Sequence, residues 1–268
     1  MKGDFVARVI SNARAAELVS DISLELPPEA SGIDPRPGQF AHLSVGGLFL
    51  RRPISIAGFD GESLRVRMIV RNAGRGSGAI ASLEPGESVR MLLPLGSPFP
   101  VEDLAERRGK SGGAKKIHLV AGGIGAAPLL FAADFIRALN EVRGGIFSVE
   151  SFAGFRDEAS SFGADEFGRA GACRLVIGGL VTDALEESLG RGAPDAVLAC
   201  GPEPMLEALQ GICSANGIAA YASLEARMGC GVGACLVCSR RARAGGGAGY
   251  RRVCRDGPSF DLSEVIFK

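Results

Sequence analysis

The chain has 268 residues, of which 46% are apolar, so it is long enough for two domains with buried cores. Its 30 basic residues balance its 30 acidic residues, and the net charge therefore gives no support for a nucleic-acid partner. No apolar run approaches the roughly 20 residues of a membrane helix, and Asp4 and Arg8 interrupt the apolar N-terminus, so we expect a soluble, cytoplasmic protein without a signal peptide.

The first hundred residues predict short strands separated by turns. Pro37-Gly38 and Pro85-Gly86 are typical turn dipeptides. Strands at this spacing favour a small antiparallel barrel. The predicted strands are 5–10, 41–45, 54–58, 64–70 and 88–93. A polar stretch at 102–116 then predicts a linker or a surface loop.

Strands and helices alternate in the second part of the chain, which indicates an open, mostly parallel sheet. The apolar periodicity predicts strands at 116–121, 145–153, 173–177 and 196–200, and helices at 128–142, 182–189 and 204–215. After Ala222 the pattern ends in a cysteine-rich segment, which we interpret as a small third module.

The first of these strands leads into Ala121-Gly-Gly-Ile-Gly-Ala-Ala-Pro, which opens a helix. Gly122, Gly123 and Gly125 would let the backbone approach a pyrophosphate at the helix N-terminus, where free amides favour negative charge. A tight strand-to-helix turn without a ligand is the alternative.

A second motif, Cys200-Gly-Pro-Glu-Pro-Met, follows a later strand and also leads into a helix. Ligands of open α/β sheets bind at the carboxyl ends of the strands, so both motifs are expected at one crevice. There Cys200 and Gly201 could pack against a nicotinamide ring, whereas a simple buried cysteine is the alternative. We expect Cys173 and Cys213 to be buried without such a role.

In the predicted barrel, Arg51-Arg-Pro-Ile-Ser-Ile combines a planar guanidinium with a small hydroxyl. The arginine matches phosphate oxygens, and Ser55 could reach polar atoms of a flavin ring. Taken alone, an edge strand with solvated arginines explains this hexapeptide better.

Four cysteines near the C-terminus have the spacing C-x4-C-x2-C followed by a distant fourth, which is the pattern of a plant-type [2Fe–2S] site. Glycines at 229, 231 and 233 allow the sharp bends of a loop around a cluster. The predicted ligands are Cys230, Cys235, Cys238 and Cys254.

Zinc is the competing metal, and it would make the chain a binding module. Zinc prefers compact C-x2-C pairs, and only Cys235 and Cys238 form one. His42 and His118 lie in apolar, strand-like segments away from the cysteines, so we expect both in cores and exclude a Rieske site.

In this order, Arg52-Pro-Ile-Ser, Gly122-Gly-Ile-Gly-Ala-Ala-Pro and Cys200-Gly-Pro-Glu-Pro-Met resemble the ferredoxin–NADP reductase superfamily. The segment from Tyr221 to Cys238, with Cys254-Arg-Asp-Gly-Pro, further resembles the electron-transfer subunits of NAD-dependent (type B) dihydroorotate dehydrogenase. The resemblance spans essentially the whole chain.

The resemblance implies FAD, NAD and a [2Fe–2S] cluster as cofactors. It assigns FAD to Arg52, Pro53, Ile54, Ser55, Ile69, Val70, Arg71, Gly76 and Ser77. Ile54 stands where the superfamily usually has an aromatic residue, and Ser77 replaces the expected threonine.

The implied fold is β plus α/β, in three parts. These are an FAD-binding antiparallel barrel (1–100), a pyridine-nucleotide domain with an open parallel sheet (101–222) and a [2Fe–2S] module (223–268).

The implied activity is transfer of electrons from dihydroorotate to NAD⁺ in de novo pyrimidine biosynthesis, through a partner's FMN, this cluster and this FAD. An FMN-containing catalytic subunit is the implied partner, in a heterotetramer of two copies of each. The alternative is a flavin and iron–sulfur subunit of an NAD(P)H–ferredoxin or sulfur oxidoreductase. Six arginines around the cysteine loop would either balance the cluster's charge or dock an acidic partner: Arg240, Arg241, Arg243, Arg251, Arg252 and Arg255.

Overall fold

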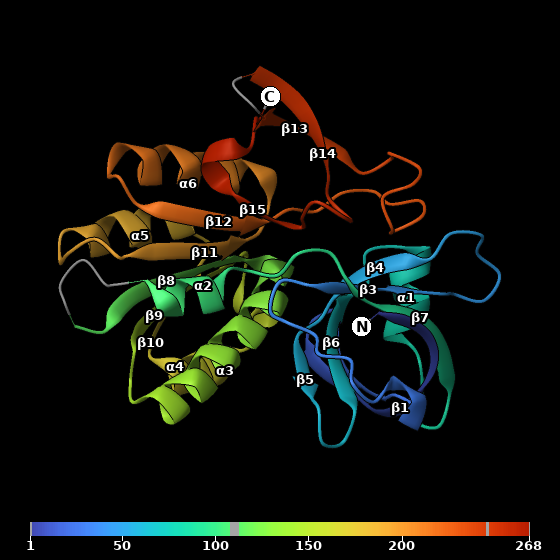
Figure 1. The fold of residues 1–268 in the computed structure, drawn as a ribbon. Helices are drawn as coiled ribbons and strands as arrows, with labels where there is room; N and C mark the ends of the chain where they lie inside the picture. Colours follow the sequence, from blue (N-terminus) through green and yellow to red (C-terminus); the bar gives the residue numbers. More distant parts are fainter. Residues whose placement is uncertain (1, 108–112, 245–246, 268) are drawn as a thin grey trace.

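The computed structural model describes residues 2–107, 113–244 and 247–267. Figure 1 shows an antiparallel β unit at the right, an α/β unit at the left, and the C-terminal segment across the top of both. Within the described part of the chain, no helix combines the length and the apolar character needed to cross a membrane.

A seven-stranded antiparallel sheet forms the N-terminal unit, in the order β4-β3-β7-β1-β2-β6-β5. The residues after β4 connect the two edges of this sheet. The Ile56 amide donates to the Gln39 carbonyl (3.0 Å), and the Ala57 amide donates to the carbonyl of Arg67 in β6 (2.9 Å). The sheet therefore curls into a barrel around a buried aliphatic core. Its elements are β1 (Gly3–Ala16), β2 (Val19–Glu25), η1 (Pro28–Ala30), β3 (Phe40–Leu43), β4 (Arg52–Ser55), β5 (Gly58–Asp60), β6 (Arg65–Arg71), α1 (Arg75–Ala81) and β7 (Ser88–Leu95).

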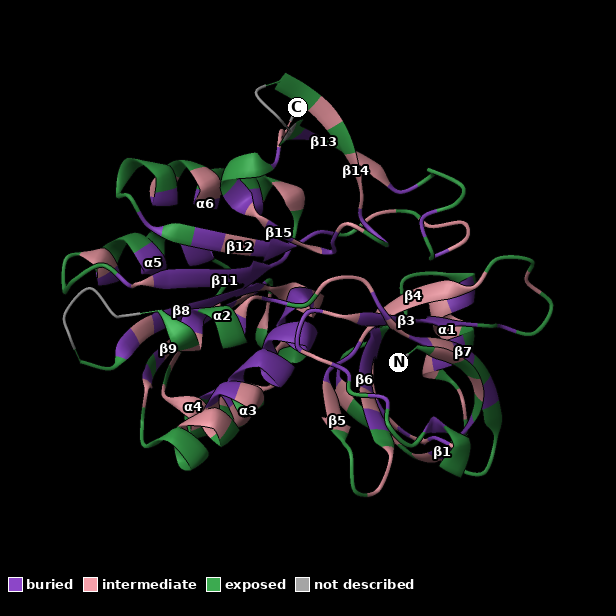
Figure 2. Cartoon of the chain, viewed as in Figure 1, coloured by how far each residue is buried: buried purple, intermediate pink, exposed green. Residues whose placement is uncertain are grey.

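The α/β unit is built on a six-stranded sheet in the order β10-β9-β8-β11-β12-β15. All neighbours are parallel except β12 and β15, which are antiparallel. Helices α3 and α4 lie on one face and α5 and α6 on the other (Figure 1). The central strands are therefore buried on both faces (Figure 2), as expected for a parallel sheet. The elements are α2 (Val101–Glu106), β8 (Lys115–Gly122), η2 (Gly123–Gly125), α3 (Ala126–Arg143), β9 (Phe147–Phe155), η3 (Glu158–Ser160), α4 (Ala164–Ala170), β10 (Ala172–Ile177), α5 (Val181–Leu189), β11 (Ala196–Cys200), α6 (Glu203–Ala215) and β12 (Ala219–Ser223).

The C-terminal segment contains the cysteine loop and the hairpin of β13 (Ser239–Ala244) and β14 (Gly247–Arg252), followed by β15 (Ser259–Asp261) and η4 (Leu262–Glu264). It is bonded to both other units. The Ser97 amide donates to Gly257 on the barrel side (2.5 Å), and the Leu224 amide donates to Pro258 on the sheet side (2.9 Å). The cysteine loop is thus held where the barrel and the α/β sheet meet.

This architecture confirms the predicted fold class, with corrections to its elements. The elements that were not predicted are β2, β5, β12, β13, β14, β15, α1 and α4, and α2 occupies the start of the segment expected to be a linker. Residues 108–112 of that segment lie outside the described residues. The limits 1–100, 101–222 and 223–268 stay a prediction, and β15 joins the sheet of the second unit.

Candidate functional site

Arg52, at the start of β4, lies against the first turn of α1. A Cβ at Gly76 would collide with the Arg52 guanidinium, so the absence of a side chain at 76 allows this contact. The guanidinium donates to the Leu50 carbonyl (2.5 Å). Ser77 supports the same turn, because its hydroxyl accepts from the Ala73 amide (3.0 Å). The structure thus brings together three of the predicted FAD contacts, Arg52, Gly76 and Ser77.

The end of strand β6 contains three further predicted FAD contacts, Ile69, Val70 and Arg71. The side chains of Ile69 and Val70 are buried in hydrophobic cores, so contact with a ligand would have to come from their backbone groups. Arg71 is exposed. It lines a cleft of about 390 Å³ together with Gly123 and Ile124 at the start of α3. The predicted flavin and nucleotide segments therefore meet at one cleft between the barrel and the α/β unit.

The two predicted nucleotide motifs contact each other directly. A Cβ at Gly125 would collide with the Cys200 carbonyl, and one at Gly122 would lie 2.7 Å from atoms of Pro202 and Met205. A Cβ at Gly201 would lie 3.1 Å from the Gly122 Cα and 2.5 Å from the Met205 side chain. Close packing of two loops accounts for these three glycines. Gly123 differs, because it has φ of 54° and a Cβ there would meet nothing within 4 Å.

Cys200 is buried at the end of β11, beside this contact. Burial raises the pKa of its thiol to about 12, and the nearby Glu225 carboxylate adds to the shift while Ser223 opposes it. The thiol therefore stays protonated at neutral pH. A protonated thiol does not act as a thiolate nucleophile, and it fits both packing against a ring and a simple buried cysteine, so the role of Cys200 stays a prediction.

The four predicted metal ligands lie in two pairs. The Cys230 amide donates to Cys235 Sγ (3.3 Å), and the Cys235 amide donates to Cys230 Sγ (3.4 Å). Cys238 Sγ and Cys254 Sγ are 3.2 Å apart and buried. Among the described residues, no three His, Cys, Asp or Glu side chains surround a position for a single metal ion. Two pairs of thiols suit a binuclear cluster, in which each iron takes two cysteines.

Backbone amides point at the more exposed of the two cysteine pairs, Cys230 and Cys235. Cys230 Sγ accepts from the amides of Val232 (3.4 Å) and Ala234 (3.2 Å) as well as from Cys235. Burial alone would raise the pKa of Cys230, but these amides outweigh it and lower the pKa to about 6. A loop that stabilises thiolate fits an iron–sulfur centre, because thiolates are the ligands and hydrogen bonds to the sulfurs tune such clusters.

His42, which the sequence indicated only as a core residue, lies against this loop. Its side chain is completely buried, as expected. A Cβ at Gly231 would lie 2.5 Å from His42 Nδ1. Phe40 shares the outward face of β3 with His42 and is also buried, in the hydrophobic cluster that contains Cys238 and Cys254. A large aromatic residue on the outward face was the sequence signal that another segment covers this strand.

Three of the six arginines near the loop form ion pairs or side-chain hydrogen bonds with other residues that the structure describes. Arg240 pairs with Glu203 (3.0 Å), Arg252 pairs with Asp256 (2.9 Å), and Arg243 donates to the Ser263 carbonyl (2.6 Å). Arg252 also donates to the Gly233 carbonyl on the cysteine loop (3.2 Å). For these three, the contacts indicate a structural role in addition to any effect on the cluster's charge.

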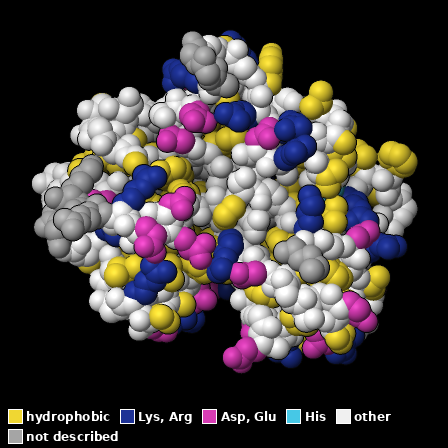
Figure 3. Space-filling model, in the orientation of Figure 1, with side chains coloured by type: hydrophobic (Ala, Val, Ile, Leu, Met, Phe, Trp, Pro, Cys, Tyr) yellow, Lys and Arg dark blue, Asp and Glu magenta, His cyan; other side chains and the backbone are white. Residues whose placement is uncertain are grey.

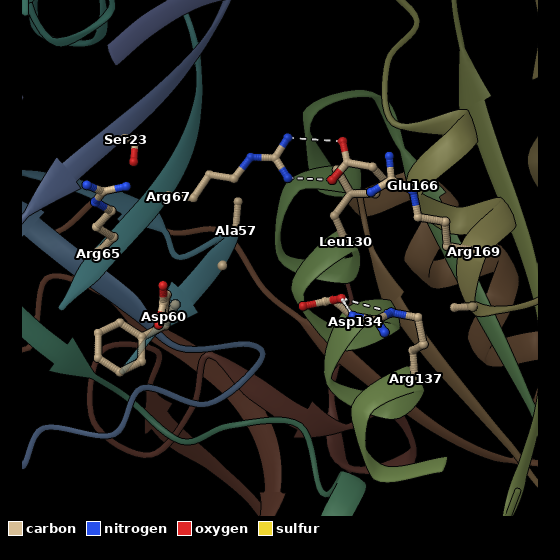
Figure 4. A pocket seen from close by; sticks show the side chains of 13 residues that line it. Ser23, Ala57, Asp60, Arg65, Arg67, Leu130, Asp134, Arg137, Glu166 and Arg169 are labelled. Carbon is tan, nitrogen blue, oxygen red and sulfur yellow. Dashed lines mark hydrogen bonds and ion pairs between the residues drawn. The ribbon is translucent and has the colours of Figure 1, made fainter. Parts of the chain in front are cut away.

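A second cleft, of about 340 Å³, separates β5 and β6 from α3 and α4. Figure 4 shows Arg67 reaching across it to Glu166. Arg67 Nη2 lies 3.0 Å from Glu166 Oε1, and the same side chain pairs with Asp21 (2.6 Å) in its own sheet. These ionic contacts join the barrel to the α/β unit, and no sequence pattern indicated them.

Comparisons with known proteins agree with this geometry. Residues 225–266, which include all four cysteines, match the family model described as the iron-sulfur cluster binding domain of dihydroorotate dehydrogenase B. Over the full length of both chains, 34% of residues are identical to the dihydroorotate dehydrogenase B (NAD(+)), electron transfer subunit, of Caldanaerobacter subterraneus subsp. tengcongensis. The chain belongs to this family of electron transfer subunits. The subunit from Shouchella clausii is 38% identical over 242 residues, which cover 86% of each chain.

Solved structures place the same family within a wider fold. A chain from the structure of the NADH-dependent reduced ferredoxin-NADP oxidoreductase superposes with a TM-score of 0.79 and 25% identity, covering 97% of this chain and 89% of that one. A flavohemoglobin from Malassezia yamatoensis has a TM-score of 0.63 and 16% identity, covering 82% of this chain and 59% of that one, which shows the fold alone.

Membership of the electron transfer subunit family confirms the resemblance read from the motifs. It also confirms the predicted role in electron transfer by an NAD-dependent oxidoreductase. The reductase fold and the iron–sulfur domain support the expected set of FAD, NAD and an iron–sulfur cluster. An electron transfer subunit implies a catalytic partner.

Proposed function

We propose that this subunit carries electrons between an FMN-containing dihydroorotate dehydrogenase catalytic subunit and NAD⁺, in pyrimidine biosynthesis. FAD, when bound, exchanges two electrons with a nicotinamide and single electrons with an iron–sulfur centre. The role of this chain is to hold the nicotinamide, the FAD and the iron–sulfur cluster in that order and to shield them from water.

The FAD site is assigned to the surface formed by β4, the end of β6 and the start of α1. Arg52 is the pyrophosphate ligand, because its guanidinium lies over the side-chain-free turn at Gly76. Arg71 borders the cleft that continues to Gly123. Ile69 and Val70 contribute backbone, and Pro53, Ile54 and Ser55 complete the set.

The pyridine-nucleotide site is assigned to the carboxyl ends of β8 and β11. The Gly122–Gly125 turn offers backbone amides at the start of α3, and Cys200 with Gly201 forms the neighbouring wall. A protonated, buried thiol suits contact with an uncharged part of a ring.

The cluster is assigned to Cys230, Cys235, Cys238 and Cys254. The observation that carries the proposal is the position of this loop, whose Gly231 packs on His42 of β3. His42 is directly opposite Pro53 of β4, the strand assigned to FAD. The proposed cluster loop therefore packs on β3, directly beside the strand assigned to FAD, and this closeness suits electron transfer between them.

The partner is proposed to dock over the cluster loop. Cys235 is exposed there, and so are the apolar side chains of Val232, Leu236 and Val237. In Figure 3 hydrophobic side chains gather at the upper right of the molecule, the side on which Figure 1 places this loop. Exposed apolar side chains beside an electron-transfer group indicate an interface. We propose that the complex is a heterotetramer with two copies of each subunit.

The test is a Cys235→Ser variant of the chain co-expressed with its partner. We expect loss of cluster absorption and of about half or more of the iron and sulfide, whereas FAD content and reduction of the flavin by NADH persist. Cys173→Ser is the matched control, because Cys173 lies on β10, far along the sheet from the loop. Unchanged iron, sulfide and visible absorption in Cys235→Ser would reject the cluster assignment.

A second candidate keeps the cofactors and changes the partner. The likeness to a chain of a ferredoxin-NADP oxidoreductase at 25% identity favours it, while the whole-length relatives favour the first proposal. Flavin analysis of the co-purified partner distinguishes them, because only the first proposal requires FMN in that partner.

A further inference from the structure

The outer face of β3 carries a buried histidine where an apolar residue would pack without cost. Strand residues alternate between faces, and Ala41 and Leu43 point into the barrel core. His42 therefore points outward, on the side of its cross-strand partners Pro53 and Leu92. The cysteine loop covers it so completely that the side chain has 0% exposure.

Among the residues that the structure describes, neither ring nitrogen of His42 has a hydrogen-bond partner. The carbonyls of Arg51 and Cys230 lie near the ring without meeting hydrogen-bond geometry. A neutral imidazole has one donor and one acceptor, and burying them unpaired is unfavourable. A buried donor without a partner, directed at a loop assigned to a cluster, indicates that the bound group provides the partner.

Gly231 fixes this arrangement from the other side. Its ideal Cβ would lie 2.5 Å from Nδ1, 3.0 Å from Cε1 and 3.1 Å from Cγ of His42. It also has φ of 71°, which side chains rarely tolerate. The loop can therefore approach the imidazole edge only with glycine at 231, immediately after the first proposed ligand, Cys230.

We propose that His42 is a positioning residue of the iron–sulfur site, and that its ring N–H stabilises the negative charge that the site gains on reduction. Hydrogen bonds to the sulfurs and the surrounding polarity set the potentials of such clusters. This inference rests on the proposed cluster site. It involves no proton transfer, because one electron enters and the histidine stays neutral.

The experiment compares His42→Leu, which removes the donor, with His42→Gln, which keeps an N–H. Each variant is purified with its partner, and iron, sulfide, the electron paramagnetic resonance signal of the reduced cluster and its midpoint potential are measured at pH 8. His118→Leu is the matched control, because His118 is also completely buried and neither of its ring nitrogens makes a hydrogen bond in the described part of the chain. It lies in β8, where its Nε2 is 3.4 Å from a carboxylate oxygen of Glu150.

We expect His42→Leu to keep the cluster and to lower the equilibrium constant for its reduction about tenfold, which is about 59 mV for one electron. His42→Gln should restore most of the shift, and His118→Leu should leave the potential unchanged. An unshifted potential and resonance signal in His42→Leu would overturn the inference. Loss of the cluster from both His42 variants would also overturn it, since the imidazole would then serve only to pack against the cysteine loop. A wild-type chain without iron and sulfide would instead reject the proposed function.

Discussion

Arg52 reaches its place because residue 76 has no side chain. Its guanidinium occupies the volume of a Gly76 Cβ and donates to the Leu50 carbonyl. The neighbouring Arg51 is held differently, by Asp4 at 2.9 Å, and the Arg51 guanidinium lowers the pKa of that carboxyl. Two adjacent arginines thus have separate tasks, one structural and one directed at the proposed flavin site.

Replacing Arg52 with alanine should weaken FAD binding about tenfold or more, because a hydrogen bond to a charged group contributes about 1.5–3 kcal/mol. Flavin content after gel filtration, followed by titration with FAD, measures this. Arg51→Ala is the control and should retain FAD. Equal flavin content in both variants would show that Arg52 is not a pyrophosphate ligand.

At the scale of elements, β6 and α4 are joined by the ionic contacts of Arg67. This side chain is only 31% exposed and Glu166 30%, so the pair is better shielded than most surface pairs. Its partners Asp21 and Glu166 raise the pKa of Arg67, which keeps it charged. The contacts lie between the barrel and the α/β unit (Figure 4), where they fix the relative position of the two.

Glu166→Gln should lower the free energy of unfolding by about 1–2 kcal/mol, because it leaves part of the Arg67 charge without a partner. A double-mutant cycle with Arg67→Ala, measured by urea unfolding, isolates the coupling. Glu25→Gln is the control, because its partner Arg8 is 60% exposed and its loss should change little. A coupling no larger than that of the Arg8–Glu25 pair would contradict a fastening role.

At the scale of the whole molecule, the exposed apolar residues near the cysteine loop indicate where a partner binds. Leu236 is 60% exposed and lies between the proposed ligands Cys235 and Cys238. Its position predicts that it becomes buried only in the complex with the catalytic subunit.

Leu236→Asp should weaken association with the catalytic subunit at least tenfold while the cluster and FAD remain, because a charge would be buried at the interface. Co-purification and sedimentation of the complex measure this. Leu180→Asp is the matched control, since Leu180 is 68% exposed and precedes α5. Identical association of both variants would place the partner elsewhere.

Much of the fold could be predicted because its signals are local. The apolar run at Ile117–Ala121 and the glycine turn that follows predict a buried strand entering a helix, and β8 and α3 have that arrangement. β13 and β14 were missed because arginines and glycines give them no apolar alternation. β2 was missed although Ile22 and Leu24 alternate with polar residues, since Leu18 turns the chain in a left-handed conformation that no sequence rule marks.

The sequence by itself determined the family, the order of the motifs and the four cysteines, because each depends on residue type and spacing along the chain. Only the tertiary structure decided which of these meet. It brought Gly231 onto His42, Gly125 onto Cys200 and Arg67 onto Glu166. Each of these contacts joins residues far apart in the sequence. They form only when the barrel, the sheet and the cysteine loop pack together, so no local pattern records them.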